Sequence, residues 1–257
     1  MQTDLISSRE NPKIKYACAL RDSEKQRAAD GLFFAEGPKL CLELAKSCKA
    51  RTAYATEAAL QKTPELAALH PVLVAPHVAE KLAGTKSSQG VFVLFETPQP
   101  DPSLLASARR ILALEGVQDP GNVGTLLRSA AAFGFDAMLL GPGCAAPFSP
   151  KTLRSSMGAA GRLPVLHAAD LPHTLHTLRE RGVTCLAAAL YHSRPLDEAG
   201  RDFPDGVCVV IGSEGQGLRD ETVAACDAAV RIPMTDRVES LNAGVAGSVL
   251  LWHFRGV

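Results

Sequence analysis

The stretch LEGVQDPGNVGTLLRSAAAFGF, residues 114–135, joins the end of an apolar run to a glycine-rich turn and a segment rich in alanine and leucine. Further apolar runs flank it, ARRILALEGV before and DAMLLG after. This order predicts a strand, a tight turn, a helix and a second strand. The turn places Asn122 between two glycines, and the helix carries a lone cation, Arg128.

The same alternation continues to the C-terminus. Strand-like runs such as LPVLHA, TCLAAAL and CVVIGS are separated by helix-like segments, and SLNAGVAGSVLLWHF is a last apolar helix. Strands separated by helices of this length predict an α/β fold with a parallel sheet covered by helices on both faces. Ligands on such sheets bind beyond the carboxyl ends of the strands. The loops that follow the strands are therefore the candidate site.

The first hundred residues predict a separate module. Residues 1–97 mix charged helical segments with short strands such as GLFFAEG and QGVFVLFE. The following ETPQPDPSLLASA has three prolines within seven residues, which is typical of a linker. We therefore expect a small α/β module at 1–97, a linker at 98–109 and the main domain at 110–257.

Composition is that of a globular protein, with 46% hydrophobic and 21% charged residues among 257. The sequence has no run of eighteen apolar residues and no secretory leader pattern, so we expect neither a membrane span nor export. Seven cysteines occur without a C-x-x-C pair, which favours reduced thiols in the cytoplasm. The paired histidines at 173 and 176 lack further ligands, and we expect no metal site.

Formal net charge is zero, which does not by itself indicate a nucleic-acid protein. Basic residues nevertheless cluster at 9–27 and 150–164. Either cluster could contact phosphates, although charge alone favours an ordinary solvated surface. The candidate contacts are Arg9, Lys13, Lys15, Arg27, Lys151 and Arg154.

Three loops of the second region carry the chemistry. QDPGNVG lacks both the G-x-G-x-x-G pattern and the P-loop lysine, which disfavours a dinucleotide site and leaves a plain turn capped by Asn122 as one interpretation. IGSEGQGL contains Glu214, which favours a cationic or hydroxyl-bearing ligand over phosphate. In RIPMTDRVESLNAGVAG either Ser240 or Asn242 starts the last helix, and close helix packing would also explain its small residues.

Together, DPGNVGTLLRSA, IGSEGQGL and IPM…VESLNAGVA resemble the three signature motifs of the SpoU (TrmH-like) RNA ribose 2′-O-methyltransferases of the SPOUT superfamily. The resemblance runs through 110–257 and includes PKTLRSSMGAAGRLPV between the first two motifs. Ala243-Gly244 departs from the family pattern, small residue for small residue. NPKIK…GLFFAEGPKL and SSQGVFVLF resemble the substrate-binding module often fused ahead of the enzyme, which favours ribosomal over transfer RNA as substrate.

The resemblance implies a C-terminal trefoil knot, a homodimer, and S-adenosylmethionine bound by loops 187–192, 211–217 and 232–242. The positions expected at the cofactor are Ala189, Gly212, Gly217, Ile232, Met234 and Leu241. The positions that match the family's polar active site are Asn122, Arg128, Glu214, Ser240 and Asn242. The implied activity is methyl transfer to a ribose 2′-hydroxyl of RNA.

The family assigns this arginine as the base, yet a guanidinium does not release its proton. We expect instead that Arg128 holds the adjacent phosphate and stabilises the developing alkoxide. Asn122 and Asn242 would orient it, while Ser240 and Glu214 would hold the loops or the target nucleotide. A non-catalytic RNA-binding relative and a nucleotide-dependent oxidoreductase are the alternatives. The last helix could use Leu250, Leu251, Trp252 and Phe254 in a dimer or in its own core.

Overall fold

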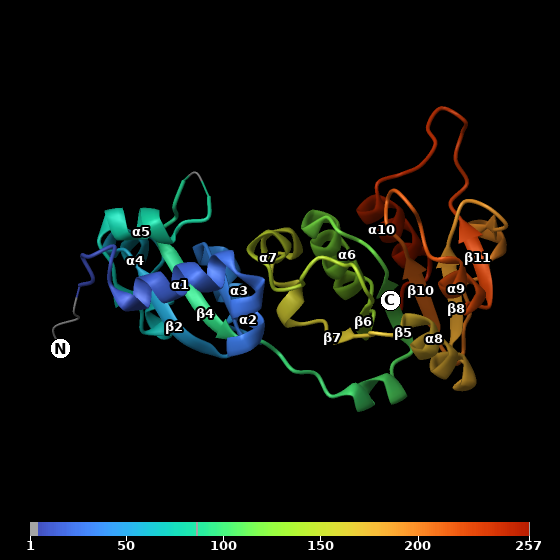
Figure 1. The fold of residues 1–257 in the computed structure, drawn as a ribbon, viewed down its shortest axis with the longest axis horizontal. Coiled ribbons are helices and arrows are strands. Elements are labelled where there is room, and N and C mark those ends of the chain that lie inside the picture. The colour runs from blue at the N-terminus through green and yellow to red at the C-terminus, as the bar shows by residue number, and fades with distance from the viewer. Residues whose placement is uncertain (1–4, 86, 257) are drawn as a thin grey trace. The chain divides into compact units, whose positions relative to one another are not determined.

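The computed structural model describes residues 5–85 and 87–256, which divide into two units (Figure 1). Among the described residues, the first unit comprises those up to 99 together with 148–161, and the second comprises 100–147 with those from 162 onward. Within the described ranges, no helix has the length and apolar composition that a membrane crossing requires. All seven cysteines lie in those ranges and are free thiols.

The first unit contains a four-stranded sheet of described residues in the order β1-β4-β2-β3. β4 pairs antiparallel with β1 and β2, and β3 joins β2 in parallel. The strands are β1 (Leu32–Glu36), β2 (Ala50–Ala55), β3 (Val72–Leu73) and β4 (Val91–Glu96). The helices are α1 (Pro12–Asp22), α2 (Glu24–Asp30), α3 (Pro38–Leu44), α4 (Glu57–Lys62), α5 (Pro76–Leu82) and α7 (Pro150–Ser156), with a 3-10 helix at Pro64–Leu69.

Helix α7 belongs to this unit although it lies far along the chain. It is packed near β1, and the ring of Phe148, just before it, lies 4.9 Å from the ring of Phe33. Ser149 caps α7 by accepting the backbone N–H of Thr152 at 3.2 Å. The apolar face of a seven-residue helix needs such tertiary packing to persist.

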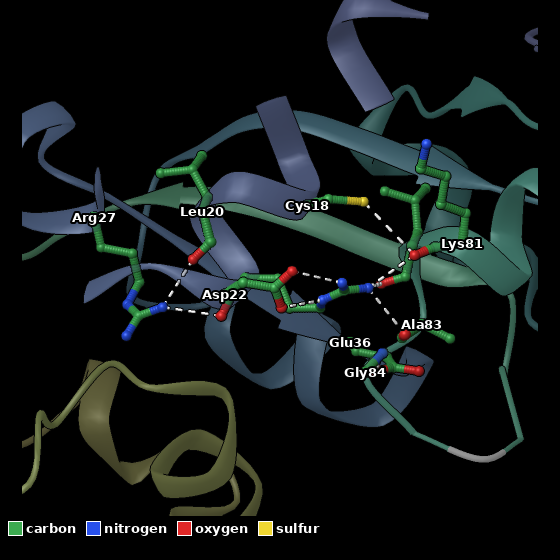
Figure 2. A network of polar contacts seen from close by, with 10 residues as sticks. Cys18, Leu20, Asp22, Arg27, Glu36, Lys81, Ala83 and Gly84 are labelled. Carbon is green, nitrogen blue, oxygen red and sulfur yellow. Dashed lines mark hydrogen bonds and ion pairs between the residues drawn. The ribbon is translucent and has the colours of Figure 1, made fainter. Parts of the chain in front are cut away.

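A half-buried polar network ties α1 to the loop after α5 (Figure 2). The Arg21 guanidinium donates to the carbonyl oxygens of Lys81, Leu82 and Ala83 at 2.8–3.0 Å. The carboxylate of Glu36, at the end of β1, accepts the N–H of Gly84 and the hydroxyl of Thr85 at 2.9 and 2.8 Å. The bonds from Arg21 satisfy open carbonyls at the C-terminus of α5, and those to Glu36 hold the backbone that follows it.

The second unit confirms the predicted parallel sheet. Seven strands of the described chain pair in parallel in the order β7-β6-β5-β10-β8-β11-β9. The strands are β5 (Arg110–Leu114), β6 (Ala137–Leu140), β7 (Val165–His167), β8 (Thr184–Ala188), β9 (Arg194–Pro195), β10 (Val207–Ile211) and β11 (Ala228–Arg231). The helices are α6 (Pro120–Ala132), α8 (Leu171–Glu180), α9 (Asp220–Ala224) and α10 (Ala243–His253), with 3-10 helices at Pro102–Ala106 and Leu196–Glu198. A further 3-10 helix, Ala159–Gly161, belongs to the first unit.

Helices cover both faces of this sheet. Val210 of β10 packs in one cluster with Leu171, Leu175 and Leu178 of α8. The next residue, Ile211, points to the opposite face because side chains alternate along a strand. There its Cδ1 lies 2.5 Å from where a Cβ on Gly247 of α10 would stand. The central strands are therefore buried on both sides, which explains their uninterrupted apolar sequence.

The structure decides three local expectations. Only the first is a correction: Asp119, not Asn122, caps α6, because its carboxylate accepts the N–H groups of Gly121 and Asn122 at 2.7 and 3.1 Å. The other two decide between alternatives that the sequence left open. Asn242, not Ser240, starts the last helix, accepting the N–H of Val245 at 3.2 Å. Leu250, Leu251 and Phe254 are buried inside the unit, so only Trp252 of that set is exposed. The knot stays a prediction.

Candidate active site

The three sequence motifs meet at the carboxyl edge of the parallel sheet. The side-chain amide of Asn122, in the first turn of α6, donates to the carboxylate of Glu214, in the loop after β10. A Cβ built on Gly244 would lie 3.0 Å from Asn122 Oδ1 and 3.1 Å from Asn242 Oδ1. Asn122, Glu214 and Asn242 therefore lie together although they are distant in the chain.

The residues around Asn122 fix its position in the first turn of α6. Asp119 caps the helix and Pro120 occupies its first turn, where a missing N–H costs nothing. The hydroxyl of Thr125 donates to the carbonyl of Gly121 at 2.9 Å. The rigid first turn leaves the Asn122 side chain free to reach Glu214.

Arg128 lies further along α6 with an exposed side chain. Among the hydrogen bonds found in the described ranges, none involves its guanidinium. It stands one helical turn after Thr125, which borders an apolar hollow together with Val245, Ser248, Val249 and Trp252 of α10. The structure thus places Arg128 on the same helix as Asn122 but does not join it to the polar cluster.

Residues 212–218 after β10, called here the glycine loop, close on themselves. Ser213 and Gly217 exchange two backbone hydrogen bonds of 3.1 and 3.0 Å. A Cβ on Gly212 would stand 2.3 Å from the carbonyl carbon of Gly217, so no larger residue fits. Gly217 has φ +70°, which other residues rarely adopt. The glycines of this loop therefore permit a close approach of the loop to itself.

The expected cofactor positions follow neighbouring strands. Ala189, Gly212 and Ile232 come directly after β8, β10 and β11, and β8 lies between the other two. The N–H of Ala189 donates to the carbonyl of Val230 at 3.1 Å. Parallel strands bring their carboxyl ends to one edge, so these three residues share it.

The third motif is the least ordered in secondary structure. Residues 232–242 form no helix or strand, and Figure 1 shows them as a long loop between β11 and α10. Ile232 and Leu241 are half-buried, whereas Met234 is 37% exposed and Ser240 is exposed. No hydrogen bond found among the described residues connects Ser240 to the Asn122 cluster.

Sequence reasoning missed one polar group beneath these loops. Glu115, the residue after β5, is 4% exposed and binds Arg219 and Thr222. Burial alone would raise the pKa of the Glu115 carboxyl, but the hydrogen bonds from Arg219 and Thr222 and the charge of Arg219 lower it overall. A carboxylate that directly follows four buried strand residues is the signal that could have found it.

The expected RNA contacts lie in the first unit. Arg9 pairs with Glu80 at 3.0 Å and Lys15 with Glu10 at 2.6 Å, and all four side chains are largely exposed. Lys13, Lys151 and Arg154 are exposed as well. Arg27 differs, because it is 8% exposed and donates to the carbonyls of Leu20 and Arg21 at 2.8 and 3.0 Å. This placement argues against Arg27 as a phosphate contact.

Among the described residues, no group of three or more His, Cys, Asp or Glu side chains is placed to hold a metal ion.

Comparison with known proteins supplies two family matches. The model of the SpoU rRNA Methylase family matches residues 109–252. The model of the MRM3-like substrate binding domain matches residues 11–93. The two matches divide the chain near the proline-rich segment.

The chain resembles full-length relatives along nearly its whole length. It is 30% identical over 252 residues to a 23S rRNA (guanosine(2553)-2'-O)-methyltransferase, RlmP, of Bacillus subtilis (strain 168), covering 98% of this chain and 99% of that protein. The crystal structure of an AdoMet-bound rRNA methyltransferase from Sinorhizobium meliloti has a TM-score of 0.85 at 27% identity, with 99% and 98% of the two chains covered. A putative RNA methyltransferase of the TrmH family from Porphyromonas gingivalis gives 0.82 at 33% identity, with 96% and 98% covered.

Proposed function

The chain belongs to the SpoU rRNA methylase family, and from this premise we propose that it is an S-adenosylmethionine-dependent RNA methyltransferase that modifies a ribose 2′-hydroxyl. The observation that carries the proposal is the meeting of all three motifs at Asn122, Glu214 and Asn242. Loops that follow parallel strands share one edge in any such sheet, but here the side chains of the three motifs come together as well.

Ribosomal RNA is the proposed substrate, in preference to transfer RNA. The chain carries a substrate-binding module ahead of the enzyme domain. It also aligns from end to end with a relative named as a 23S rRNA methyltransferase. We propose that this reaction takes place in the cytoplasm.

The residues at the carboxyl edge suit S-adenosylmethionine. The glycine loop offers backbone close to the edge, and Ile232, Met234 and Leu241 offer apolar side chains that can lie against the face of an adenine. Ala189, Gly212 and Gly217 complete the proposed set. The cofactor supplies a methyl group attached to a positively charged sulfur.

In-line transfer forms a bond from the ribose oxygen to the methyl carbon while the carbon–sulfur bond breaks and its electron pair stays on sulfur. The hydroxyl proton passes to water. The chain must position the hydroxyl and stabilise the negative charge that develops on its oxygen. We assign the charge stabilisation to Arg128, which also holds a neighbouring phosphate.

The remaining polar residues position the reactants. Asn122 and Glu214 fix each other through their hydrogen bond, and Asn242 borders the same space at the start of α10. Ser240 lies on the loop that leads into Asn242 and is proposed to contact the target nucleotide once RNA is bound.

The first unit is proposed to bind the RNA backbone. The proposed contacts to RNA phosphates are its exposed cations, namely Arg9, Lys13, Lys15, Lys151 and Arg154. Each neutralised phosphate adds affinity that falls as salt rises. Arg27 is left out because its guanidinium is occupied by backbone carbonyls.

A homodimer is proposed through α10. Val245, Val249 and Trp252 are spaced three to four residues apart and are 51%, 36% and 48% exposed. They form one apolar stripe beside Thr125 of α6. A second copy would cover this stripe and bring Arg128 close to the interface.

The test is incubation of the protein with bulk ribosomal RNA or transfer RNA and a labelled methyl donor, followed by mapping of the modified nucleotide. We expect label in ribosomal RNA as one alkali-resistant 2′-O-methyl dinucleotide linkage. A protein that binds S-adenosylmethionine by calorimetry but labels transfer RNA alone would contradict the substrate. Absence of both binding and label would favour a non-catalytic RNA-binding relative.

A further inference from the structure

We propose that Glu115 is a positioning residue that holds both ends of the glycine loop and thereby sets Glu214 against Asn122. The inference rests on the proposed function, because this loop is the one assigned to the cofactor. Neither the sequence motifs nor the family resemblance singles out Glu115.

The carboxylate of Glu115 fixes the far end of the glycine loop. Its Oε1 accepts Nε and one terminal nitrogen of Arg219 at 2.8 and 2.7 Å and the hydroxyl of Thr222 at 2.8 Å. Its Oε2 accepts the backbone N–H of Arg219 at 3.0 Å. Arg219 is the residue that follows the loop and caps α9. One buried side chain thus binds both the backbone and the guanidinium at that point.

The backbone of Glu115 fixes the near end of the same loop. Its N–H donates to the carbonyl of Ile211, the last residue of β10, at 2.9 Å. The next residue, Gly116, lies against the loop, since a Cβ on it would stand 3.4 Å from the Cβ of Ser213. The residues on either side of the glycine loop, Ile211 and Arg219, are therefore both hydrogen-bonded to Glu115.

The loop transmits this anchoring to its tip. Ser213 and Gly217 are paired through their backbones, so the loop cannot absorb a shift of Arg219 by opening. Glu214 lies inside the closed turn and accepts the Asn122 amide. Asn122 lies on the α6 segment that leads on from Glu115, which makes Glu115 the common reference for both motifs.

The negative charge of Glu115 is needed as well as its shape. A glutamine at 115 keeps one acceptor oxygen, but its NH2 group replaces the other oxygen and faces N–H donors of Arg219. The glutamine NH2 and the Arg219 N–H that faces it then both lack an acceptor. The Glu115 side chain is 5% exposed and that of Arg219 is 51% exposed, so the loss falls on the hydrogen bonds at the buried carboxylate end of the pair. Arg219 also pairs with Glu221, which keeps the guanidinium in place but cannot supply the hydrogen bonds to the loop end.

A second ion pair of the same unit provides a matched control. Asp227 accepts Nε of Arg179 at 2.7 Å and the backbone N–H of Cys185 at 2.8 Å. Like Glu115 it joins an arginine to a strand backbone. Asp227 contacts the start of β8 and none of the loops assigned to the cofactor.

The experiment compares Glu115→Gln, Arg219→Lys and the control Asp227→Asn with the unaltered protein. S-adenosylmethionine binding is measured by calorimetry, the free energy of unfolding by urea, and kcat and the KM for RNA by methyl transfer. We expect Glu115→Gln to weaken cofactor binding by about tenfold or more while the KM for RNA stays within about twofold. Arg219→Lys keeps the positive charge, so it should weaken cofactor binding less than Glu115→Gln does. Asp227→Asn should lose stability without losing affinity.

Two outcomes overturn the inference. Either Glu115→Gln binds the cofactor as the unaltered protein does, or Asp227→Asn loses as much affinity for the same loss of stability. If Glu115→Gln does not fold, Thr222→Val replaces it, since that change removes a single donor to Oε1. Failure of the proposed function is distinguished because the unaltered protein would then neither bind the cofactor nor methylate RNA.

Discussion

Arg128 is the residue on which the chemistry depends most directly. Its exposed position on α6 makes it dispensable for folding. Its proposed tasks are to hold a phosphate with two parallel hydrogen bonds and to face the developing alkoxide. Lysine at the same position keeps the charge but cannot form the planar fork.

Arg128→Lys should therefore lower kcat by about 100-fold without changing S-adenosylmethionine binding or the free energy of unfolding. Single-turnover methyl transfer at saturating RNA measures the effect. Arg109→Lys is the control, because Arg109 is exposed at the opposite end of β5. Near-normal turnover of Arg128→Lys would remove this arginine from the chemistry.

Glu115 gives a prediction about pH. Its pKa is lowered below the ordinary value of 4.5 in the folded state. A depressed folded pKa contributes stability that is present above the unfolded pKa and is lost as pH falls through the folded pKa. The other charges that act on the Glu115–Arg219 pair are those of Glu221 and Asp170.

The free energy of unfolding of the unaltered protein should therefore exceed that of Glu115→Gln at neutral pH, and the difference should shrink below about pH 4.5. Urea unfolding of both proteins from pH 7 downward measures it. A difference that is constant or grows as the pH falls would contradict the lowered pKa.

At the scale of residues, the sequence predicted which motif residues belong to one site. It missed the contacts that form only when distant segments pack together. Asn122 and Glu214 were expected at one site and are hydrogen-bonded. The partnership of Glu115 with Arg219 was not foreseen, because it joins the end of β5 to the residue after the glycine loop, and β5 and β10 become neighbours only after the sheet has formed. The capping role of Asp119 was missed although Asp before a proline at the first helical position is a common helix start, as common as one at Asn122.

At the scale of elements, the glycine loop shows why glycine recurs. Gly212 has backbone atoms of Gly217 and Leu218 within 2.5 Å of where a Cβ would stand, whereas Gly215 has nothing within 4 Å. The two glycines lie in one loop and differ only in the space around them.

Gly212→Ala should therefore lower the thermal midpoint by several degrees, since backbone cannot move aside as a side chain can. Gly215→Ala should leave the midpoint within about a degree. Differential scanning calorimetry of both variants without ligand measures the effect. Equal midpoints would mean that the two arms of the loop are not in contact in solution.

The parallel sheet could be predicted because strands buried on both faces require continuous apolar runs, and RILALEGV and CVVIGS have them. The packing of α7 near β1 could not be predicted from the sequence. Its sequence, PKTLRSS, is that of a short amphipathic helix without a stated partner, and the ring contact of Phe148 with Phe33 joins segments far apart in the chain.

At the scale of the whole molecule, charge is divided between units even though it sums to zero. The two basic clusters seen in the sequence, at 9–27 and 150–164, both fall largely in the first unit. Phosphate binding by that unit would leave the second unit to hold the cofactor and the sugar. Affinity for RNA and methyl transfer should accordingly respond to different substitutions.

The apolar stripe on α10 should make a second copy necessary for activity. Val249→Asp places a carboxylate in the middle of Val245, Val249 and Trp252, where burial against another copy would leave the charge unpaired. Light scattering at micromolar concentration should show a dimer for the unaltered protein and a monomer for Val249→Asp. Methyl transfer should be lost in parallel, because Arg128 follows Thr125, which borders this stripe, by about one helical turn. Leu5→Asp, at an apolar position of the first unit that is 57% exposed, should stay dimeric and active. A monomeric unaltered protein that methylates RNA at full rate would show that Arg128 acts within its own chain.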